Sequence, residues 1–362
     1  MYRIVALKVA LTVSLTLLVA VALLNSAPSF AHHGYGGRYN QEVIQELEGE
    51  LVNVLWRNPH VRLTIKDAEG GLWNIEAGSP TVMLRRGITE AMVNASKQIK
   101  IAGLGSMRGR NEMTASNILL ASGEELLLTS GSKPRWQTSN LVGGGNFLIN
   151  AVGDSSKPEL GIFRVWSTVV SDPVSKGIYP EAADPSLSYR YPLTPAALAY
   201  LDNFDPATDN PLEAYCVSKG MPMVMDQPFP MEFTDMGDNI VARLEEYDTV
   251  RTIYMGNSME GQVDGVPQPT EASLLGVSTG KWDGDTLVVT TNQISWPYFS
   301  QMGIRQSGDM VLEERFTPVE NGSRLNYKLT ATDAVTFTEP VVLEKFWIWD
   351  PSVEVVEYRC TE

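Results

Sequence analysis

Histidine is the residue type in this chain that most directly suggests chemistry, and the 362 residues contain only three. His32 and His33 are adjacent, and His60 ends the segment Trp56-Arg57-Asn58-Pro59-His60. A cut before His32 would let that residue offer its α-amino nitrogen and a ring nitrogen to one metal ion. His33 or His60 would complete a three-nitrogen set that suits Cu(II). The alternative is a mobile His-His tail and a His60 that only stabilises a turn.

The first 31 residues give the reason to expect that cut. Two basic residues precede an apolar run from Val9 to Leu24, and Ser29 and Ala31 stand at the positions that a signal peptidase reads. The pattern predicts a signal peptide over residues 1–31 and a periplasmic or secreted protein. An uncleaved membrane anchor is the alternative, which the short apolar run disfavours.

The two cysteines, Cys216 and Cys360, are predicted to form a disulfide bond. In an oxidising compartment an even cysteine count favours pairing, and this bond would tie the C-terminus to the middle of the chain. Two unpaired thiols are the less favoured alternative. So few cysteines and histidines exclude a multi-cysteine zinc site and a disulfide-dense miniprotein.

The chain is acidic, and its charge is uneven. The formal net charge is −15. Residues 32–135 hold 12 basic and 11 acidic residues, whereas residues 136–362 hold 14 basic and 32 acidic residues. An acidic protein repels nucleic acid and anionic membranes, so we expect no nucleic-acid partner and no membrane contact beyond the export signal. The change in charge also predicts a domain boundary near residue 135.

Residues 32–130 are predicted to form an OB-like domain. Alternating apolar and polar residues predict five strands and a short sixth, near 46–56, 60–65, 72–76, 98–103, 113–120 and 125–128. Ser79-Pro80 predicts the start of a helix that stops at Gly87. Three strands, a helix and two further strands follow one another in the order of a five-stranded OB-type barrel.

The rest of the chain is predicted to be a linker and a larger β domain. Residues 131–160 are rich in Gly, Ser and Pro, which is typical of linkers. Over residues 161–362 short strands and turns recur, which predicts an antiparallel barrel or sandwich. Its last hairpin is expected to pair Leu343–Trp349 with Val353–Arg359. The predicted fold class is therefore all-β with minor α.

Aromatic residues mark two places where a small-molecule ligand could bind. Trp56 and Arg57 lie on a predicted barrel turn, where a ring and a cation could hold an anionic or aromatic ligand, or could simply be part of a structural turn. Trp282 and Trp347 lie in strands of the second domain. Their barrel could enclose a lipophilic molecule or could be a packed core without a cavity.

Catalytic patterns are scarce, and no catalytic residue is assigned. The segment at residues 276–282 only faintly resembles a phosphate-binding loop and is interpreted as a strand entering a turn. No nucleophile elbow is expected. Carboxylates of the second domain could act as acid and base if two shared a pocket, although a solvated acidic face is the commoner explanation; among them are Glu313, Glu314, Asp333, Glu339 and Glu344. Three functions stay open: a binder or accessory protein for a lipophilic or aromatic molecule, a copper-binding protein, and a hydrolase or lyase.

Several motifs resemble those of a bacterial exported family of unknown function with an OB-like domain: Ala31-His32-His33-Gly34, Trp56-x-Asn58-Pro59-His60 and Leu84-Arg85-Arg86-Gly87. The second half is similar to a companion β domain of related bacterial proteins, through the segments 276–289, 314–316 and 358–360. The resemblance spans most of the chain after residue 31 and implies no particular reaction.

Overall fold

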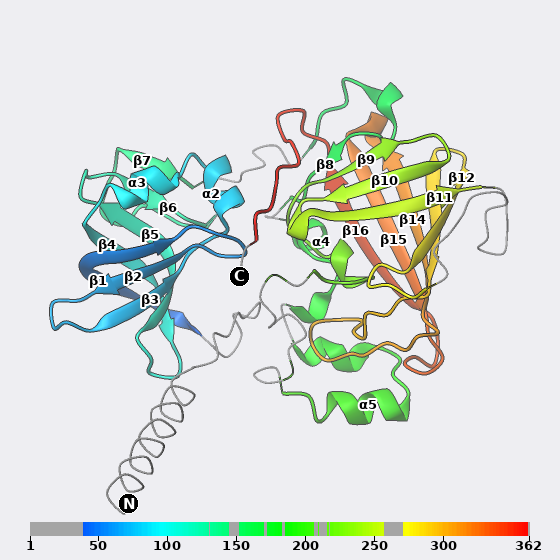
Figure 1. The fold of residues 1–362 in the computed structure, drawn as a ribbon, viewed down its shortest axis with the longest axis horizontal. Helices are drawn as coiled ribbons and strands as arrows, with labels where there is room; N and C mark the ends of the chain where they lie inside the picture. The colour runs from blue at the N-terminus through cyan, green and yellow to red at the C-terminus, as the bar shows by residue number, and fades with distance from the viewer. Residues whose placement is uncertain are drawn as a thin grey trace, which may run out of the picture.

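The computed structural model describes residues 39–129, 131–144, 152–169, 172–182, 185–205, 209, 216, 218–256 and 271–360. Its strands form two sheets, A and B, which build two neighbouring domains (Figure 1). The all-β fold class with minor α is confirmed. Among these residues no helix has the length and apolar composition that spanning a bilayer requires.

Sheet A contains the strands β1 (Tyr39–Leu55), β2 (Arg62–Lys66), β3 (Leu72–Glu76), β4 (Gln98–Ser106), β5 (Glu112–Leu120), β6 (Glu125–Leu127) and β7 (Leu141–Gly143). Their order is β3-β2-β1-β4-β5-β6-β7. A further, parallel pairing of β3 with β5 closes β1 to β5 into a five-stranded barrel. The OB-like barrel is therefore confirmed.

Two short helices connect β3 with β4. Helix α2 (Pro80–Arg85) begins as predicted, because the Ser79 side chain accepts a hydrogen bond from the amide of Val82 at 3.3 Å. Helix α3 (Glu90–Asn94) was not predicted, and Thr89 caps it in the same way. Met83 of α2 and Val93 of α3 are buried in the core of sheet A.

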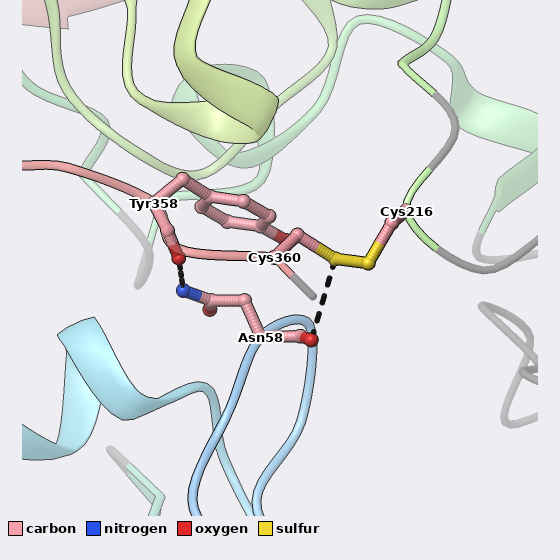
Figure 2. The surroundings of a disulfide bond; sticks show 4 residues. All are labelled: Asn58, Cys216, Tyr358 and Cys360. Atoms are coloured by element: carbon pink, nitrogen blue, oxygen red, sulfur yellow. Dashed lines mark hydrogen bonds between the residues drawn. A yellow bond between two sulfur atoms is a disulfide. The ribbon is translucent and has the colours of Figure 1, made fainter. Parts of the chain in front are cut away.

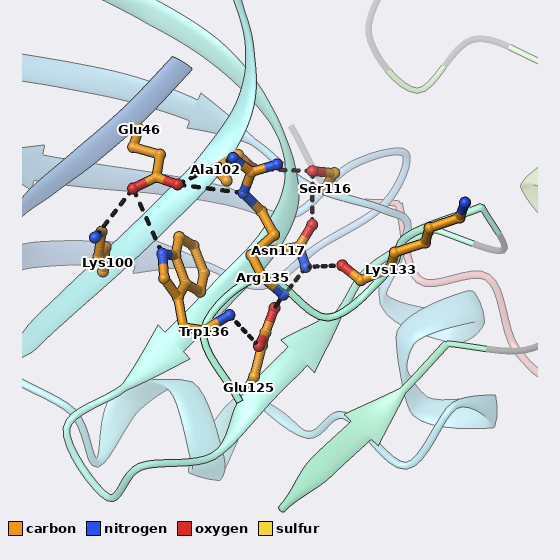
Figure 3. A network of polar contacts seen from close by, with 9 residues as sticks. All are labelled: Glu46, Lys100, Ala102, Ser116, Asn117, Glu125, Lys133, Arg135 and Trp136. Carbon is orange, nitrogen blue, oxygen red and sulfur yellow. Dashed lines mark hydrogen bonds and ion pairs between the residues drawn. The ribbon is translucent and has the colours of Figure 1, made fainter. Parts of the chain in front are cut away.

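Residues 131–144 differ from the prediction of a linker, because they continue sheet A. The Glu125 carboxylate is fully buried and accepts hydrogen bonds from the backbone amides of residues 135–137 at 2.8–3.0 Å and from Asn117 Nδ2 at 2.7 Å (Figure 3). Burial by itself raises the pKa of Glu125, but these donors outweigh burial and the pKa is lowered. The carboxylate holds the loop against the barrel, and β7 then pairs with β6.

Sheet B contains nine strands: β8 (Val165–Trp166), β9 (Met231–Asp235), β10 (Asn239–Leu244), β11 (Thr249–Met255), β12 (Val277–Asp283), β13 (Thr286–Asn292), β14 (Val311–Val319), β15 (Arg324–Thr332) and β16 (Val341–Ile348). They follow one another in chain order, and all neighbours are antiparallel except β11 and β12. A bridge between Ser167 and Ile348 links the two edges, so the sheet is a nearly closed barrel.

Short helical segments flank sheet B. They are α4 (Pro173–Lys176) and α5 (Pro195–Leu201), with the 3₁₀ turns η1 (Pro158–Leu160), η2 (Pro180–Ala182), η3 (Pro185–Arg190), η4 (Met223–Met225), η5 (Glu246–Asp248) and η6 (Glu320–Gly322). Helix α4 lies against β16. The connections η4 and η5 carry or adjoin charged side chains that line a cleft.

The predicted last strand, Val353–Arg359, is wrong. The backbone amides of Val356 and Tyr358 donate to the carboxylates of Glu245 at 3.2 Å and Asp248 at 3.0 Å, respectively. Because its donors are bonded to side chains, the segment does not join a ladder. It runs instead from sheet B to a point between the two domains (Figure 1, red).

Candidate functional site

The turn from Trp56 to His60 lies at the boundary of the two domains. Trp56 packs against the core of sheet A. The buried Asn58 donates a hydrogen bond from Nδ2 to the backbone oxygen of Tyr358, and its own backbone oxygen lies 3.4 Å from Sγ of Cys360 (Figure 2). The turn is therefore fixed to the C-terminal segment.

The predicted disulfide bond between Cys216 and Cys360 is confirmed. It joins the C-terminal segment to the chain just before η4 (Figure 2). Residues that are 144 positions apart are thereby held next to the Asn58 turn. The bond fixes the segment that contacts both domains.

A second contact between the domains starts from Arg85, the last residue of α2. Its guanidinium donates to both oxygens of Glu245, at 2.9 and 2.5 Å, and to the backbone oxygen of Glu354 at 3.0 Å. Glu245 is 0% exposed. A bidentate pair with a buried carboxylate is strong and directional. The Trp56–His60 turn and the Leu84–Gly87 motif of the first domain therefore both contact the second domain.

A cleft of about 310 Å³ opens beside the Asn58 turn and receives side chains from both domains. The first domain contributes Pro59, His60, Gly78, Ser79 and Val82. The second contributes Lys219, Asp226, Pro228, Phe229, Glu246, Gln301 and Tyr358. A cleft in which several polar groups converge beside apolar side chains is a candidate small-molecule site.

His60 is held in the cleft wall by a carboxylate of its own domain. Its Nδ1 lies 2.5 Å from Oε1 of Glu76, at the end of β3. Both side chains are mostly buried. A proton on Nδ1 is the tautomer that suits this carboxylate, and it makes Nε2 the basic ring nitrogen. The pair therefore orients an imidazole that can accept a proton.

An ion pair of the second domain forms another part of the wall. Lys219 Nζ lies 2.6 Å from Oε2 of Glu246 and donates to the backbone oxygen of Asp226 at 2.9 Å. Lys219 and Glu246 are each less than a tenth exposed. Burial raises the pKa of Glu246, and Lys219 opposes that rise. The next two residues, Tyr247 and Asp248, have positive φ angles of 57° and 50°, so a strained turn presents this carboxylate.

Asp226 has one carboxylate oxygen that is uncommitted. Oδ1 accepts a hydrogen bond from the amide of Ile178 at 2.7 Å. Within the described residues Oδ2 accepts none. The buried Lys345 is a cation that interacts with Asp226. It donates from Nζ to the backbone oxygen of Gln227 at 3.2 Å. Burial lowers the pKa of Lys345 to about 8, against an opposing effect of Asp226.

The ligand residues expected from the sequence lie in different environments. Trp282 is 45% exposed, and its ring packs edge-on against Phe163. Trp347 is fully buried against Tyr327 in the core of sheet B. Trp56 and Arg57 stay half-buried in the turn between the domains.

The copper hypothesis stays a prediction. His32 and His33 lie outside the described residues. His60 is bonded to Glu76. In the part of the chain that the structure describes, no group of three or more His, Cys, Asp or Glu side chains is close enough to hold a metal ion.

The carboxylates singled out in the second domain are scattered. Glu314 is buried in an ion pair, Asp333 accepts hydrogen bonds from Ser307 and Thr336, and the other three, Glu313, Glu339 and Glu344, are exposed. The sequence analysis missed Asp226 and Glu246, which share one cleft. A usable signal was the Glu245-Glu246-Tyr247-Asp248 run, because three acids in a tight connection between two strands are unusual.

The comparisons with known proteins bear on the first domain alone. Searches of curated proteins and of solved structures give no match to the chain. Residues 20–115 match the model of a family of unknown function (DUF6152). This stretch includes the Trp56–His60 turn and Arg85, and it agrees with the resemblance to a family of unknown function. Over those residues the chain is therefore similar to a family to which no activity is attached.

Proposed function

We propose that this protein is an exported binding protein that holds a small polar molecule in the cleft between its two domains. One observation carries the proposal: a single cleft receives an oriented imidazole from the first domain and a carboxylate and an ion pair from the second. Ligand sites occur preferentially at domain interfaces, where two surfaces can enclose a small molecule.

The cleft is a better candidate than the barrel interior of sheet B. The interior aromatic and methionine side chains are buried against one another, with Met221, Met225 and Trp347 at most 1% exposed. Among the residues that the structure describes, an interior packed in this way leaves little room for a lipophilic ligand. The cleft instead combines polar groups with the rings of Phe229 and Tyr358. The ligand that fits is polar, with an apolar or aromatic part.

Export is part of the proposal. The signal-peptide pattern over residues 1–31 supports it, and so does the disulfide bond between Cys216 and Cys360, because such bonds persist in oxidising compartments. The periplasm or the exterior of the cell is therefore the proposed location.

The test uses two variants of one helix. Val82 lines the cleft, whereas Leu84 is 52% exposed on another face of α2. Benzylamine, benzoate and benzamide serve as charged and neutral probes, with binding followed by ligand-observed NMR. We expect at least one probe to bind the wild type and Leu84→Trp and not Val82→Trp, in which the indole fills the cleft. Binding of no probe, or equal binding by both variants, would contradict the proposal.

Acid–base catalysis in the same cleft is a second candidate. The observation that favours it is that Asp226 and Glu246 line one cleft with the His60–Glu76 pair, and that the pKa of Glu246 is raised. A carboxyl group with a raised pKa in a cleft is a common candidate for a general acid. His60 would then be the base that activates water.

Hydrolysis of p-nitrophenyl acetate tests this candidate. The variant His60→Gln keeps a hydrogen-bonding side chain beside Glu76 but removes the basic nitrogen. We expect its rate above the uncatalysed background to fall about tenfold or more, because general-base catalysis contributes roughly 10²–10⁴-fold. Equal rates for the variant and the wild type would exclude His60 as the base.

A further inference from the structure

We propose that the cleft selects a small organic cation, and that its ammonium group binds Oδ2 of Asp226. This inference rests on the proposed function, since it names the class of ligand for the same cleft. It assigns the charge of the ligand and the residue that anchors it.

Hydrogen bonds hold Asp226 in one position. Its Oδ1 is held by the amide of Ile178 at 2.7 Å, and its backbone oxygen by Lys219 Nζ at 2.9 Å. The carboxylate is therefore fixed in place before any ligand arrives. Its Oδ2 accepts no hydrogen bond from the described part of the chain. A preorganised, uncommitted carboxylate oxygen is a strong acceptor for an ammonium group.

The other charged side chains of the cleft are already paired. Lys219 and Glu246 form an ion pair at 2.6 Å, and His60 lies 2.5 Å from Glu76. Lys345 is the cation behind Asp226, but it donates to the backbone oxygen of Gln227. Its pKa is lowered to about 8, so near neutral pH it is still mostly protonated and offsets part of the negative charge of Asp226. What remains for a ligand is a negative charge.

The electrostatic field of the whole second domain also favours a cationic ligand. Residues 136–362 hold 14 basic and 32 acidic residues. An acidic surface of this kind raises the local concentration of cations and steers them toward a negatively lined cleft. Anions are repelled over the same distance.

The walls of the cleft suit the rest of such a ligand. The rings of Phe229 and Tyr358 stand edge to face with centroids 5.4 Å apart. They are only 5% and 1% exposed, so a small part of each ring is open to contact with the hydrocarbon part of an amine. The Gln301 amide also lines the cleft and makes no hydrogen bond within the described residues. It can bind a hydroxyl or carbonyl group of the ligand.

The experiment compares three probes of one shape with two matched variants. Dissociation constants of benzylamine, benzoate and benzyl alcohol are measured by ligand-observed NMR on the full-length oxidised protein. Asp226→Asn removes the anchoring charge at constant shape. Asp238→Asn removes an exposed charge from the turn between β9 and β10 and is the control. Circular dichroism melting curves confirm that both variants fold.

We expect the wild type and Asp238→Asn to bind benzylamine at least about tenfold more tightly than they bind the other two probes. We expect Asp226→Asn to bind benzylamine at least about tenfold more weakly than the wild type does, because it loses a charge-assisted hydrogen bond. Unchanged affinity in Asp226→Asn would overturn the anchor. If benzoate binds more tightly than benzylamine and Val82→Trp still blocks its binding, the ligand is not a cation, and the proposed function stands. Competition of Ca²⁺ or Mg²⁺ with benzylamine at micromolar concentration would overturn the organic class of the ligand. Absence of binding by every probe would remove the proposed function itself.

Discussion

Two charged clusters in the second domain show how a buried ion pair inside the core differs from one that lines a cleft. Inside the barrel of sheet B, Arg251 and Glu314 form a bidentate pair and are 2% and 0% exposed. At the boundary of the domains, Lys219 and Glu246 form a pair of similar burial. Burial alone does not distinguish the two clusters.

The difference lies in which atoms remain available. Glu314 also accepts from Tyr327 at 2.9 Å, while Arg251 also donates to Ser278 and Thr291. Ser278 belongs to the G-x-S-x-G run at residues 276–280, which lies mainly in β12 and forms no nucleophile elbow. The pair inside the barrel is thus saturated. The pair in the cleft adjoins Asp226, which keeps one oxygen uncommitted within the described residues.

The largest effect is expected inside the barrel. Arg251→Met leaves Glu314 buried without its counterion, and removing one partner of a buried pair costs about 3–5 kcal/mol of the free energy of unfolding. Guanidinium chloride denaturation measures this loss. The double variant Arg251→Met/Glu314→Leu is expected to recover most of it. A single variant as stable as the wild type would show that the pair is not structural.

The next effect concerns the segment that holds the domains together. The double variant Cys216→Ser/Cys360→Ser removes the disulfide bond, which typically contributes about 2–4 kcal/mol. Since Cys360 adjoins the Asn58 turn, binding of a cleft probe is expected to weaken as well. Denaturation and ligand-observed NMR on the same sample measure both. Loss of stability with unchanged probe affinity would separate the disulfide from the cleft.

A smaller effect is expected from Lys345, a buried cation that interacts with the charges of the cleft. Burial lowers its pKa in the folded protein to about 8, from the 10.5 of an exposed lysine. Between these values the unfolded chain binds more protons than the folded chain, so the free energy of unfolding rises with pH. From about pH 7.5 to about pH 9.5 this contribution is about 2 kcal/mol. Denaturation at several pH values should show the rise in the wild type and not in Lys345→Met. Parallel curves would contradict the lowered pKa.

The smallest effect on stability is expected at Asp226. Asp226→Asn keeps the oxygen that accepts from Ile178, so the free energy of unfolding should change by less than about 1 kcal/mol. This contrasts with Arg251→Met in the same domain. A loss as large as that of Arg251→Met, measured by the same denaturation, would place Asp226 among the structural charges.

Much of the fold followed from local patterns, and the site did not. The strands of the OB-like barrel, the Ser79 cap and the disulfide bond could be predicted, because alternation, capping and cysteine number are local or simple signals. The fold-back of residues 131–144 depends on the distant Glu125 carboxylate, and the extended C-terminal segment depends on Glu245 and Asp248. Neither partnership is visible in sequence spacing.

The cleft is harder still, because its walls come from segments far apart in the chain. His60, Lys219 and Gln301 are brought together only by the packing of one domain against the other. The sequence singled out His60 within its turn but assigned it to copper. The ligand residues Trp56, Arg57, Trp282 and Trp347 were selected by residue type, and residue type does not predict that Trp282 is 45% exposed while Trp347 is fully buried.

The crystal structure of the oxidised protein soaked in benzylamine tests the central claim most directly. The account predicts electron density for one benzylamine in the cleft, with its nitrogen at hydrogen-bond distance, about 2.7–3.0 Å, from Oδ2 of Asp226. Its ring should lie against Phe229 or Tyr358. An empty cleft, or density inside the barrel of sheet B beside Trp347, would contradict the account.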